Sequence, residues 1–413
     1  MNFLIIIAGM VVFLLLTLFL VSLLLFAKSK LTPQGAVNIN INNEKDLEVS
    51  PGSSLLSTLS DRKIFLPSAC GGGGTCGMCK CQVTAGGGEI LPTETGFFTR
   101  KQQLSNWRLG CQVKVKDSLK IVVPEEVLGV KKWECEVVSN RNIATFIKEF
   151  VVKLPEGETL KFKSGGYIQV SVPKCEIDFQ NIEVEPEFRA DWDAMKLWDL
   201  TMKNPDPTFR AYSMANHPAE GNIIMLNVRI ATPPWDKAKG AFKPVNPGIC
   251  SSFIYNCKPG DKVMISGPYG EFFLRDTDSE MIFIGGGAGM APMRSHIFHL
   301  FHTLRTTRNV SFWYGARSRS EIFYEQDFRN IEQHFPNFKF HIALSEPKKE
   351  DSWTGDTGFI HQVLYDNYLK THASPEDIEY YMCGPPMMTS SVVKLLDSLG
   401  VPQEMVMFDD FGG

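Results

Sequence analysis

Hydrophobic residues follow three successive patterns along this 413-residue chain. The first is an apolar run from Phe3 to Ala27 that contains no charged residue. As a helix this run would reach about 37 Å, more than the hydrocarbon core of a bilayer at about 30 Å. A signal peptide needs a basic start and a shorter run, so the pattern predicts one membrane anchor over residues 1–30. Because Lys28 and Lys30 follow directly, we expect the N-terminus outside and the remaining chain in the cytoplasm.

The second pattern is the alternation of apolar and polar residues that is typical of half-buried strands. Early strands are expected at 36–43, 47–49, 81–83, 111–115 and 119–123, with a short helix at 54–60. Short strands packed on one helix predict an α+β domain over residues 35–125.

A second group of alternating segments follows a boundary near residues 124–132. Its strands are expected at 134–138, 146–154, 165–172, 209–216, 227–230, 260–263 and 266–272. They predict an antiparallel β-barrel over residues 130–275. Residues 175–207 break the alternation, and two interpretations of this acidic, aromatic insertion stay open. It is either a docking surface or a solvated loop with a small core of its own.

The third pattern is a series of short apolar strands that alternate with turns and helices. Strands are expected at 281–284, 310–317, 338–344 and 380–383, and helices at 295–305 and 388–399. This alternation predicts an α/β domain with a parallel sheet over residues 276–413.

Composition and charge narrow the functional classes. A net charge of -4 gives no signature of nucleic-acid binding. Ten cysteines are too few and too irregularly spaced for a secreted disulfide scaffold, and they indicate a reducing compartment.

Four of the cysteines have a spacing that suits an iron–sulfur cluster. Cys70, Cys76 and Cys79 lie on a glycine-rich loop, and Cys111 follows downstream. The first gap is one residue longer than in the plant-type C-x4-C-x2-C pattern. Glycines let the backbone wrap closely around a [2Fe-2S] cluster and point N–H groups at its sulfurs. A structural zinc site usually pairs two short knuckles, so the cluster is favoured, with Cys81 as a spectator or an outer neighbour.

The barrel carries a candidate flavin site at Arg210, Tyr212 and Ser213. A fixed guanidinium can neutralise a flavin phosphate, a tyrosine ring can lie on the isoalloxazine, and a serine hydroxyl can reach the ring N5. Alone, this pattern is more often an ordinary strand. It gains weight from Asn227-Val228 and from the turn at 247–253, which opens a helix able to bind pyrophosphate.

The α/β region carries a candidate nucleotide site. Residues 285–294 form a glycine-rich turn between a strand and a helix, which is the arrangement of a dinucleotide phosphate cradle. The spacing is not G-x-G-x-x-G, so it is not the fingerprint of the common dehydrogenases. Cys383 ends a strand where it can touch a nicotinamide, although a buried small hydrophobe is the ordinary alternative.

Four segments together resemble the ferredoxin–NADP reductase superfamily. They are R-A-Y-S at 210–213, G-I-C-S-S at 248–252, G-G-G-A-G-M-A-P-M-R at 285–294 and Y-M-C-G-P-P at 381–386. With the cysteine-rich module and the apolar run ahead of them, the whole chain is similar to the F subunits of bacterial sodium-translocating NADH:quinone oxidoreductases. The fold that this implies is a membrane anchor, a ferredoxin-like (β-grasp) [2Fe-2S] domain, an FAD barrel and a nucleotide domain.

The resemblance assigns roles to individual residues. Iron is assigned to Cys70, Cys76, Cys79 and Cys111, and catalytic roles are assigned to Tyr212, Ser213 and Cys383. The residues assigned to FAD and NADH are Arg210, Tyr212, Ser213, Asn227, Val228, Gly248, Cys250, Ser251, Ser252, Gly286, Gly287, Gly289, Met290, Cys383, Gly384 and Phe411. Phe411 is the candidate for an aromatic ring over the flavin, with Phe408 in reserve.

The implied activity is electron entry into a membrane complex. Hydride passes from NADH to FAD, and single electrons pass through the cluster to flavins of partner subunits and on to quinone. The residues leave NADPH open, because Arg317, Ser318 and Arg319 can grip a 2′-phosphate, whereas the resemblance implies NADH. No intramembrane polar group suggests a sodium path, so sodium transport is assigned to partner subunits in the bacterial inner membrane.

Two other functions use the same modules. The reductase component of an oxygenase is usually soluble, so the apolar run counts against it. A non-enzymatic iron–sulfur carrier with a degenerate flavin domain would lack Arg210, Ser213 or the glycine turn, and all are present.

Overall fold

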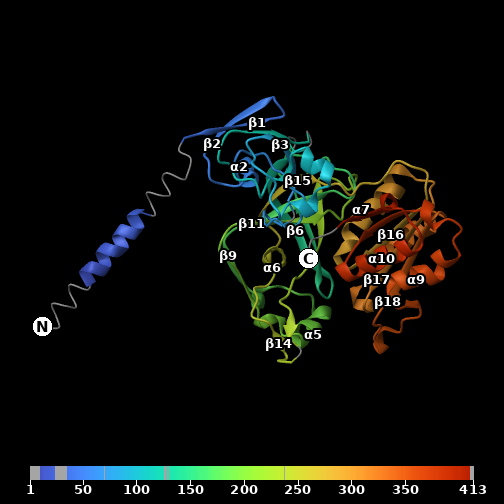
Figure 1. Ribbon diagram of the computed structural model, residues 1–413. Coiled ribbons are helices and arrows are strands. Elements are labelled where there is room, and N and C mark those ends of the chain that lie inside the picture. Colours follow the sequence, from blue (N-terminus) through green and yellow to red (C-terminus); the bar gives the residue numbers. More distant parts are fainter. Residues whose placement is uncertain are drawn as a thin grey trace. The chain divides into compact units, whose positions relative to one another are not determined.

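The protein is represented by a computed structural model that describes residues 10–23, 35–68, 70–124, 127, 130–236 and 238–409. The chain forms two compact units: residues 1–68 with 72–129, and residues 130–413 with 69–71. Figure 1 shows their helices and strands in order of sequence.

Residues 10–23 form a helix with exposed side chains. The rest of the predicted anchor from Phe3 to Ala27 lies outside the described residues. Within the part of the chain that the structure describes, no helix has the length and apolar character needed to cross a membrane.

The first unit contains a five-stranded sheet in the order β2-β1-β5-β3-β4. The bounds are β1 Val37–Ile41, β2 Lys45–Val49, β3 Lys80–Ala85, β4 Trp107–Leu109, β5 Leu119–Val122, α2 Leu55–Asp61, η1 Thr95–Phe97 and α3 Arg100–Leu104. β1 and β5 are parallel, and the other pairs are antiparallel. The apolar positions of β1, Ile39 and Ile41, share a buried core with Leu55 and Leu59 of α2, which confirms the predicted alternation.

One strand prediction in this unit is wrong. Residues 111–115 form a turn and a single bridge, whereas the paired strand β4 ends before them at Leu109. The amide of Gln112 donates to the carbonyl of Leu109 at 2.8 Å, and the amide of Leu55 donates to the carbonyl of Val113 at 2.8 Å. The alternation there reflects burial of Val113 and Val115 beneath α2, because loop residues over a helix can alternate as strand residues do.

The second unit begins with an antiparallel sheet in the order β11-β8-β15-β6-β7-β12. The bounds are β6 Lys131–Ala144, β7 Ile147–Lys153, β8 Tyr167–Val172, β11 Thr208–Ser213, β12 Ile223–Arg229, β15 Lys262–Tyr269, and α6 Ile249–Asn256. A bridge between Met214, which follows β11, and Leu226 of β12 links the two edges, so the sheet closes as a barrel. A small hairpin, β13 Trp235–Asp236 and β14 Ala241–Phe242, lies outside the barrel sheet.

The insertion at 175–207 is ordered structure rather than a loop. It contains β9 Cys175–Asp178, η2 Phe179–Asn181, α5 Pro186–Ala194, η3 Leu197–Asp199 and β10 Thr201–Asn204. Its buried residues Phe179, Trp192 and Met202 belong to the same apolar cluster as the barrel strands. The interpretation as a loop with its own core is therefore wrong, because its aromatic residues extend the barrel core.

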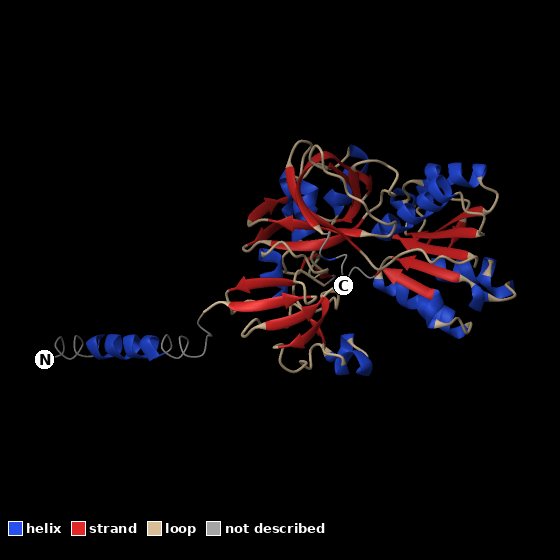
Figure 2. Cartoon of the chain, turned by 90° about the horizontal axis from the view of Figure 1, so that it is seen from above, coloured by secondary structure: helices blue, strands red, loops and turns tan. Residues whose placement is uncertain are grey.

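The rest of the second unit is a parallel sheet in the order β19-β18-β17-β16-β20-β21. The strands are β16 Met281–Gly286, β17 Val310–Ala316, β18 Phe338–Leu344, β19 Asp356–Thr357, β20 Glu379–Cys383 and β21 Val406–Asp409. The main helices are α7 Met290–Phe298, α8 Glu325–His334, α9 Ile360–Asn367 and α10 Pro386–Ser398, and they cover both faces of the sheet (Figure 2).

The glycine turn is shorter than expected. It ends with η4 Gly287–Gly289, and α7 starts at Met290 rather than at Ser295. A π-helical turn, η5 His299–Leu304, follows α7. The early start places Met290, Ala291 and Pro292 inside the helix, where they are buried.

Candidate functional site

The cysteine loop of the first unit has the backbone that a cluster requires. Gly72 and Gly77 have φ angles of +93° and +67°, which only glycine adopts without strain. A Cβ on Gly77 would also overlap the ring of Phe97. The glycines are therefore needed for the path of the loop, as the sequence predicted.

The thiol pair Cys79 and Cys111 fits iron. Both are buried, and the backbone N–H of Cys111 donates to Sγ of Cys79 at 3.5 Å. The neighbouring Cys111 thiol and burial raise the pKa of Cys79, so two thiolates here need a cation. Cys70 and Cys76 are half-buried. Among the described residues, no three Cys, His, Asp or Glu side chains converge on one ion, whereas a [2Fe-2S] cluster takes its thiolates in pairs on two irons.

A buried ion pair, which the sequence did not reveal, supports the fourth cysteine. Arg108 on β4 donates to Glu94 at 2.7 Å, and the two side chains are 5% and 0% exposed. Arg108 also donates to the carbonyls of Gly87 and Gly88, and Glu94 accepts from the amide of Leu109 at 2.8 Å. The pair thus fixes the strand end just before Cys111. Its two members are far apart in sequence from the first three cysteines, so no local pattern pointed to them.

In the second unit, the end of β11, the strand expected to bind flavin, meets the parallel sheet. The hydroxyl of Ser213, at the end of β11, donates to Oδ2 of Asp409 on β21 at 2.6 Å. Asp409 is the register partner of Cys383 on β20. Ser213 and Cys383, both expected to act in hydride transfer, therefore both neighbour Asp409, which sequence reasoning missed.

The nucleotide turn packs closely on the same strand end. A Cβ on Gly289 would overlap the carbonyl of Cys383, and a Cβ on Gly384 would approach both backbone polar atoms of Gly286. The glycine turn and the Cys-Gly turn therefore contact each other through the backbone. Gly287 has a φ of +55°. Met290 is fully buried, so its side chain packs in the core rather than facing a nucleotide.

The predicted pyrophosphate turn has features that suit an anionic group. α6 begins after Gly248 with no side chain capping its first amides. The hydroxyl of Ser251 bonds the carbonyl of Gly248 at 3.1 Å, whereas the buried hydroxyl of Ser252 has no partner among the described residues. Cys250 is buried, and burial raises its pKa to about 12, so it stays a neutral thiol. The uncapped amides and the Ser252 hydroxyl can donate hydrogen bonds to the oxygens of a phosphate group.

The other residues predicted to bind flavin have contacts within the protein or are buried. Arg210 donates to the carbonyl of Phe209 at 2.7 Å, and Tyr212 lies half-buried beside it with its pKa raised by burial. Val228 is buried in the barrel core. The amide of Asn227 donates to the Tyr324 hydroxyl at 2.8 Å. Phe411 lies outside the described residues, and Phe408 is 51% exposed on β21.

Polar pairs join the barrel to the nucleotide sheet within the second unit. Arg294 on α7 binds both carboxylate oxygens of Glu220, at 2.7 and 2.8 Å, and the carbonyl of Ala215 at 2.8 Å. The Tyr324 hydroxyl donates to Glu149 on β7 at 2.6 Å. These contacts join α7 and the residue before α8 to the barrel, one of them just after the end of β11.

Of the basic residues after β17, Arg317 has its guanidinium bound to a carboxylate, whereas Arg319 bonds a carboxylate only through its backbone. Arg317 pairs with Glu321, and this contact raises the pKa of Arg317. The backbone N–H of Arg319 donates to Asp351 at 3.2 Å. Of the two arginines, Arg317 therefore has its charge compensated, and the side chain of Arg319 is exposed.

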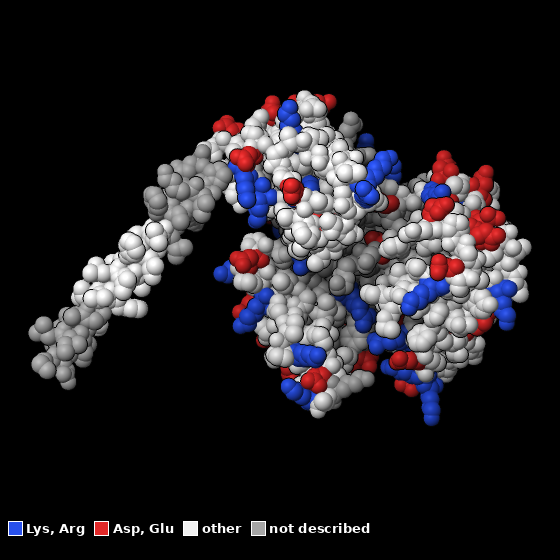
Figure 3. Space-filling view, in the orientation of Figure 1, with Lys and Arg blue, Asp and Glu red and all other residues white. Residues whose placement is uncertain are grey.

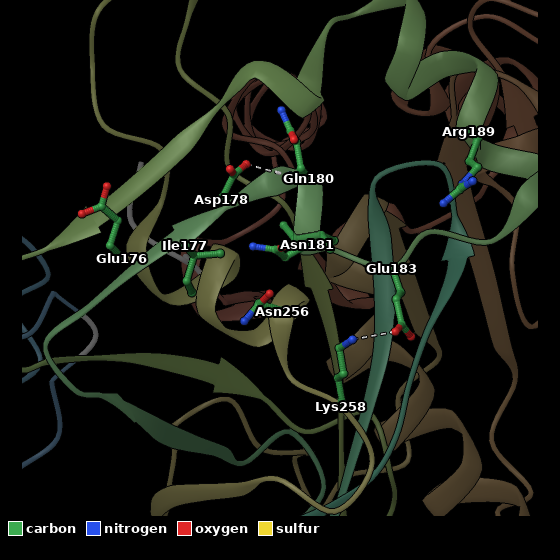
Figure 4. Close-up of a pocket in the computed structure, with 10 residues that line it drawn as sticks. Glu176, Ile177, Asp178, Gln180, Asn181, Glu183, Arg189, Asn256 and Lys258 are labelled. Carbon is green, nitrogen blue, oxygen red and sulfur yellow. Dashed lines mark hydrogen bonds and ion pairs between the residues drawn. The ribbon is translucent and has the colours of Figure 1, made fainter.

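A cavity of about 560 Å³ lies in the inserted segment, away from these residues (Figure 4). Its polar lining includes Asp178, which caps the amide of Gln180, and Glu183, which pairs with Lys258 at 2.8 Å. Because most of its lining residues are polar or charged, the cavity offers no flat apolar wall for a flavin ring. Lys and Arg are interspersed with Asp and Glu on the face in Figure 3.

Comparison with known proteins identifies the family. The family of 2Fe-2S iron-sulfur cluster binding domains matches residues 39–116, and the oxidoreductase NAD-binding domain matches residues 283–394. The F subunit of the Na(+)-translocating NADH-quinone reductase of Methylococcus capsulatus is 56% identical over 408 residues, covering 99% of each chain. The corresponding protein of Klebsiella pneumoniae is 55% identical over 410 residues, 99% of this chain and 100% of that one.

The chain belongs to the family of Na(+)-translocating NADH-quinone reductase F subunits. As a member of this family it is an oxidoreductase that takes electrons from NADH and uses FAD and a [2Fe-2S] cluster. The predicted family, activity and cofactors are confirmed.

Solved structures share the fold of this chain. A cytochrome P450 reductase of Amycolatopsis has a TM-score of 0.62 at 20% identity, and covers 91% of this chain and 98% of its own. The ferredoxin reductase in carbazole 1,9a-dioxygenase has a TM-score of 0.59 at 22% identity, with the same coverage of 91% and 98%. The predicted ferredoxin domain, barrel and parallel-sheet domain are confirmed.

Proposed function

We propose that electrons pass through this chain from NADH to FAD, then singly through the [2Fe-2S] cluster to a flavin of a partner subunit. The observation that carries the proposal is the contact of 2.6 Å between Ser213 and Asp409, because it joins the flavin strand to the nucleotide strand ends. FAD, when bound, accepts a hydride at N5 and releases electrons one at a time.

The proposed binding residues follow the three domains, with boundaries near 130 and 276. Cys70, Cys76, Cys79 and Cys111 hold iron. Arg210, Tyr212, Gly248, Ser251 and Ser252 hold the flavin, and Gly286, Gly287, Gly289 and Gly384 cradle the nucleotide. Cys383 lies where the nicotinamide docks.

Ser213 and Asp409 act as a hydrogen-bonded pair at the site of hydride arrival. Asp409 accepts a hydrogen bond from the Ser213 hydroxyl, so it fixes the rotamer of that hydroxyl. Asp409 itself is half-buried, which leaves a route for a proton to reach solvent. The chain thus positions the reacting groups, and hydride transfer needs no further general acid.

NADH is the proposed donor in preference to NADPH. The guanidinium of Arg317 is already paired with Glu321, and Asp351 accepts from the amide of Arg319. A 2′-phosphate entering here would meet carboxylates, whereas a 2′-hydroxyl can donate to them.

The assembled enzyme is proposed to lie at the bacterial inner membrane. The apolar run from Phe3 to Ala27 anchors the chain once, with the electron-transfer domains in the cytoplasm, because Lys28 and Lys30 follow the run. Partner subunits take the electron to quinone and carry sodium.

Anaerobic stopped-flow spectroscopy of the detergent-purified full chain tests this proposal. NADH should bleach the flavin band first and the cluster band second. Ser213→Ala should slow flavin reduction on the order of tenfold to a hundredfold, since misplacing reacting groups costs about that much. Ser391→Ala, which removes a hydroxyl that bonds its own helix, is the matched control. An unchanged rate in Ser213→Ala, or cluster reduction before flavin reduction, would refute the proposal.

A further inference from the structure

The side chain of Gln112 lies against the sulfur of the fourth cysteine. Its Nε2 donates to Sγ of Cys111 at 3.7 Å. Gln112 is half-buried, so water competes only partly for this contact. The spacing of the cysteines alone assigns no role to the glutamine that follows Cys111.

Three neighbours hold the amide of Gln112 in this orientation. The hydroxyl of Thr93 donates to Oε1 at 3.5 Å, and because an iron-bound thiolate can only accept, Nε2 is the atom that faces the sulfur. The backbone of Gln112 is fixed by its hydrogen bond to Leu109 at 2.8 Å. A Cβ on Gly74 would lie 2.5 Å from Nε2, so a glycine is required there for the amide to fit.

A donor at this sulfur has a defined electronic effect. One-electron reduction of the cluster adds one negative charge, which is shared by the irons and their sulfurs. An N–H group pointing at a ligand sulfur stabilises that charge more than it stabilises the oxidised state, and hydrogen bonds to the sulfurs are known to set cluster potentials.

We infer that Gln112 is a positioning residue that raises the reduction potential of the [2Fe-2S] cluster through Cys111. This inference rests on the proposed role of Cys111 as an iron ligand. It makes the cluster a better acceptor for the single electrons that leave the flavin, and Thr93 acts through Gln112 by holding its amide.

Redox titration of the detergent-purified full chain, followed by EPR of the reduced cluster, tests the inference. Gln112→Met keeps the length of the side chain and removes the donor. It should lower the midpoint potential by up to ~59 mV, a tenfold change for one electron, which corresponds to one hydrogen bond. Gln112→Glu should lower it further because it adds a negative charge. Thr93→Val should give a smaller shift in the same direction.

Gln103→Met is the matched control, since the Gln103 amide donates to the carbonyl of Phe98 at 2.9 Å in the same unit. If Gln112→Met shifts the potential no more than Gln103→Met, the inference is wrong. If Gln112→Met loses its cluster, Thr93→Val and pulsed EPR of wild-type protein carrying ¹⁵N in glutamine side chains decide. No ¹⁵N coupling and no shift in Thr93→Val would overturn the inference. A normal cluster in Cys111→Ala would instead refute the ligand assignment.

Discussion

The cysteine loop, most of which belongs to the first unit, and the proposed hydride site of the second unit are assembled in opposite ways. Three of the four cysteines lie within ten residues, on a backbone bent by glycines with positive φ. The proposed hydride site takes Ser213 from β11, Cys383 from β20 and Asp409 from β21. A side-chain hydrogen bond joins β11 to β21, and backbone pairing joins β20 to β21. A local site depends on backbone conformation, whereas a composite site depends on contacts between segments far apart in sequence.

The supporting charges differ in the same way. Glu94 and Arg108 are buried and bond backbone groups of their own unit close to Cys111. Arg294 is buried too, but its partner Glu220 is 23% exposed, and the pair joins helix α7 to the segment that follows β11. We therefore expect the Glu94–Arg108 pair to stabilise the fold around Cys111, and the Arg294–Glu220 pair to align the barrel with the parallel sheet. Substitutions at the two pairs should affect different steps.

Arg108→Leu should have the largest effect. It leaves the carboxylate of Glu94 buried without a partner, which typically costs about 3–5 kcal/mol. We expect the cluster absorbance to disappear at a much lower urea concentration, while flavin reduction by NADH persists. Lys203→Leu is the control, because its exposed pair with Glu176 is worth about 0–1 kcal/mol. The double variant Glu94→Leu/Arg108→Leu should recover part of the loss. A cluster as stable in Arg108→Leu as in the control would contradict the role of the pair.

Arg294→Leu should give the converse result, with a smaller effect on stability. It removes the bidentate contact with Glu220 and the bond to Ala215, so the barrel and the nucleotide sheet lose alignment. We expect flavin reduction in stopped flow to slow about tenfold or more, while chemical reduction of the cluster is unchanged. Arg294→Lys keeps the positive charge but cannot bind both carboxylate oxygens at once. Its rate of flavin reduction should lie between those of the wild-type protein and Arg294→Leu. Equal rates in all three proteins would show that the pair does not control alignment.

The same contrast explains what the sequence could predict. The cysteine spacing, the R-A-Y-S strand end and the glycine turn are contiguous, so each could be located without a structure. The alternation of β1 and the apolar strands β16 and β17 likewise gave the correct elements. Local patterns carry local structure, because each residue reports the burial of its own position.

Other features depend on tertiary contacts and gave no local pattern. Asp409 joins the hydride site only because β21 pairs with β20, and an Asp near the chain end has no distinguishing context. The segment 111–115 alternates as a strand does, yet its alternate residues face α2 from a turn. The helices α8 and α9 went unpredicted, and the aromatic insertion shares the barrel core rather than forming its own.

Lys148 offers a test of burial without pairing. It lies on β7 with 1% exposure, and its ammonium contacts only the carbonyl and the ring of Tyr255 among the contacts found for the described side chain. Burial lowers the pKa of Lys148 from 10.5 to about 8. Lys148→Met should therefore stabilise the barrel by about 1–2 kcal/mol at neutral pH, after the lost contacts with Tyr255 are subtracted.

The pH dependence of that gain has a definite sign. Between pH 10.5 and about 8 the unfolded lysine binds a proton that the folded one does not, so the wild-type protein loses stability as the pH falls through this window. The advantage of Lys148→Met should be small above pH 10.5 and complete below about pH 8. Thermal unfolding of both proteins, compared at each pH, measures it. A constant difference across the window would show that burial does not shift the pKa of the lysine.

Glu321→Gln should have the smallest effect and would sharpen the account of the composite site. It releases the Arg317 guanidinium and removes a negative charge from the region proposed for the ribose. We expect kcat/KM for NADPH to rise on the order of fivefold relative to NADH, the size of a partly exposed charge interaction. Glu325→Gln is the control, because Glu325 pairs at 3.8 Å with Arg329 one turn further along the same helix, α8. If the ratio stays constant, Glu321 does not discriminate between the nucleotides. If Glu325→Gln changes the ratio of kcat/KM for NADPH to that for NADH equally, the effect comes from the net charge of the domain. It would then act by long-range electrostatics rather than through the contact between Glu321 and Arg317.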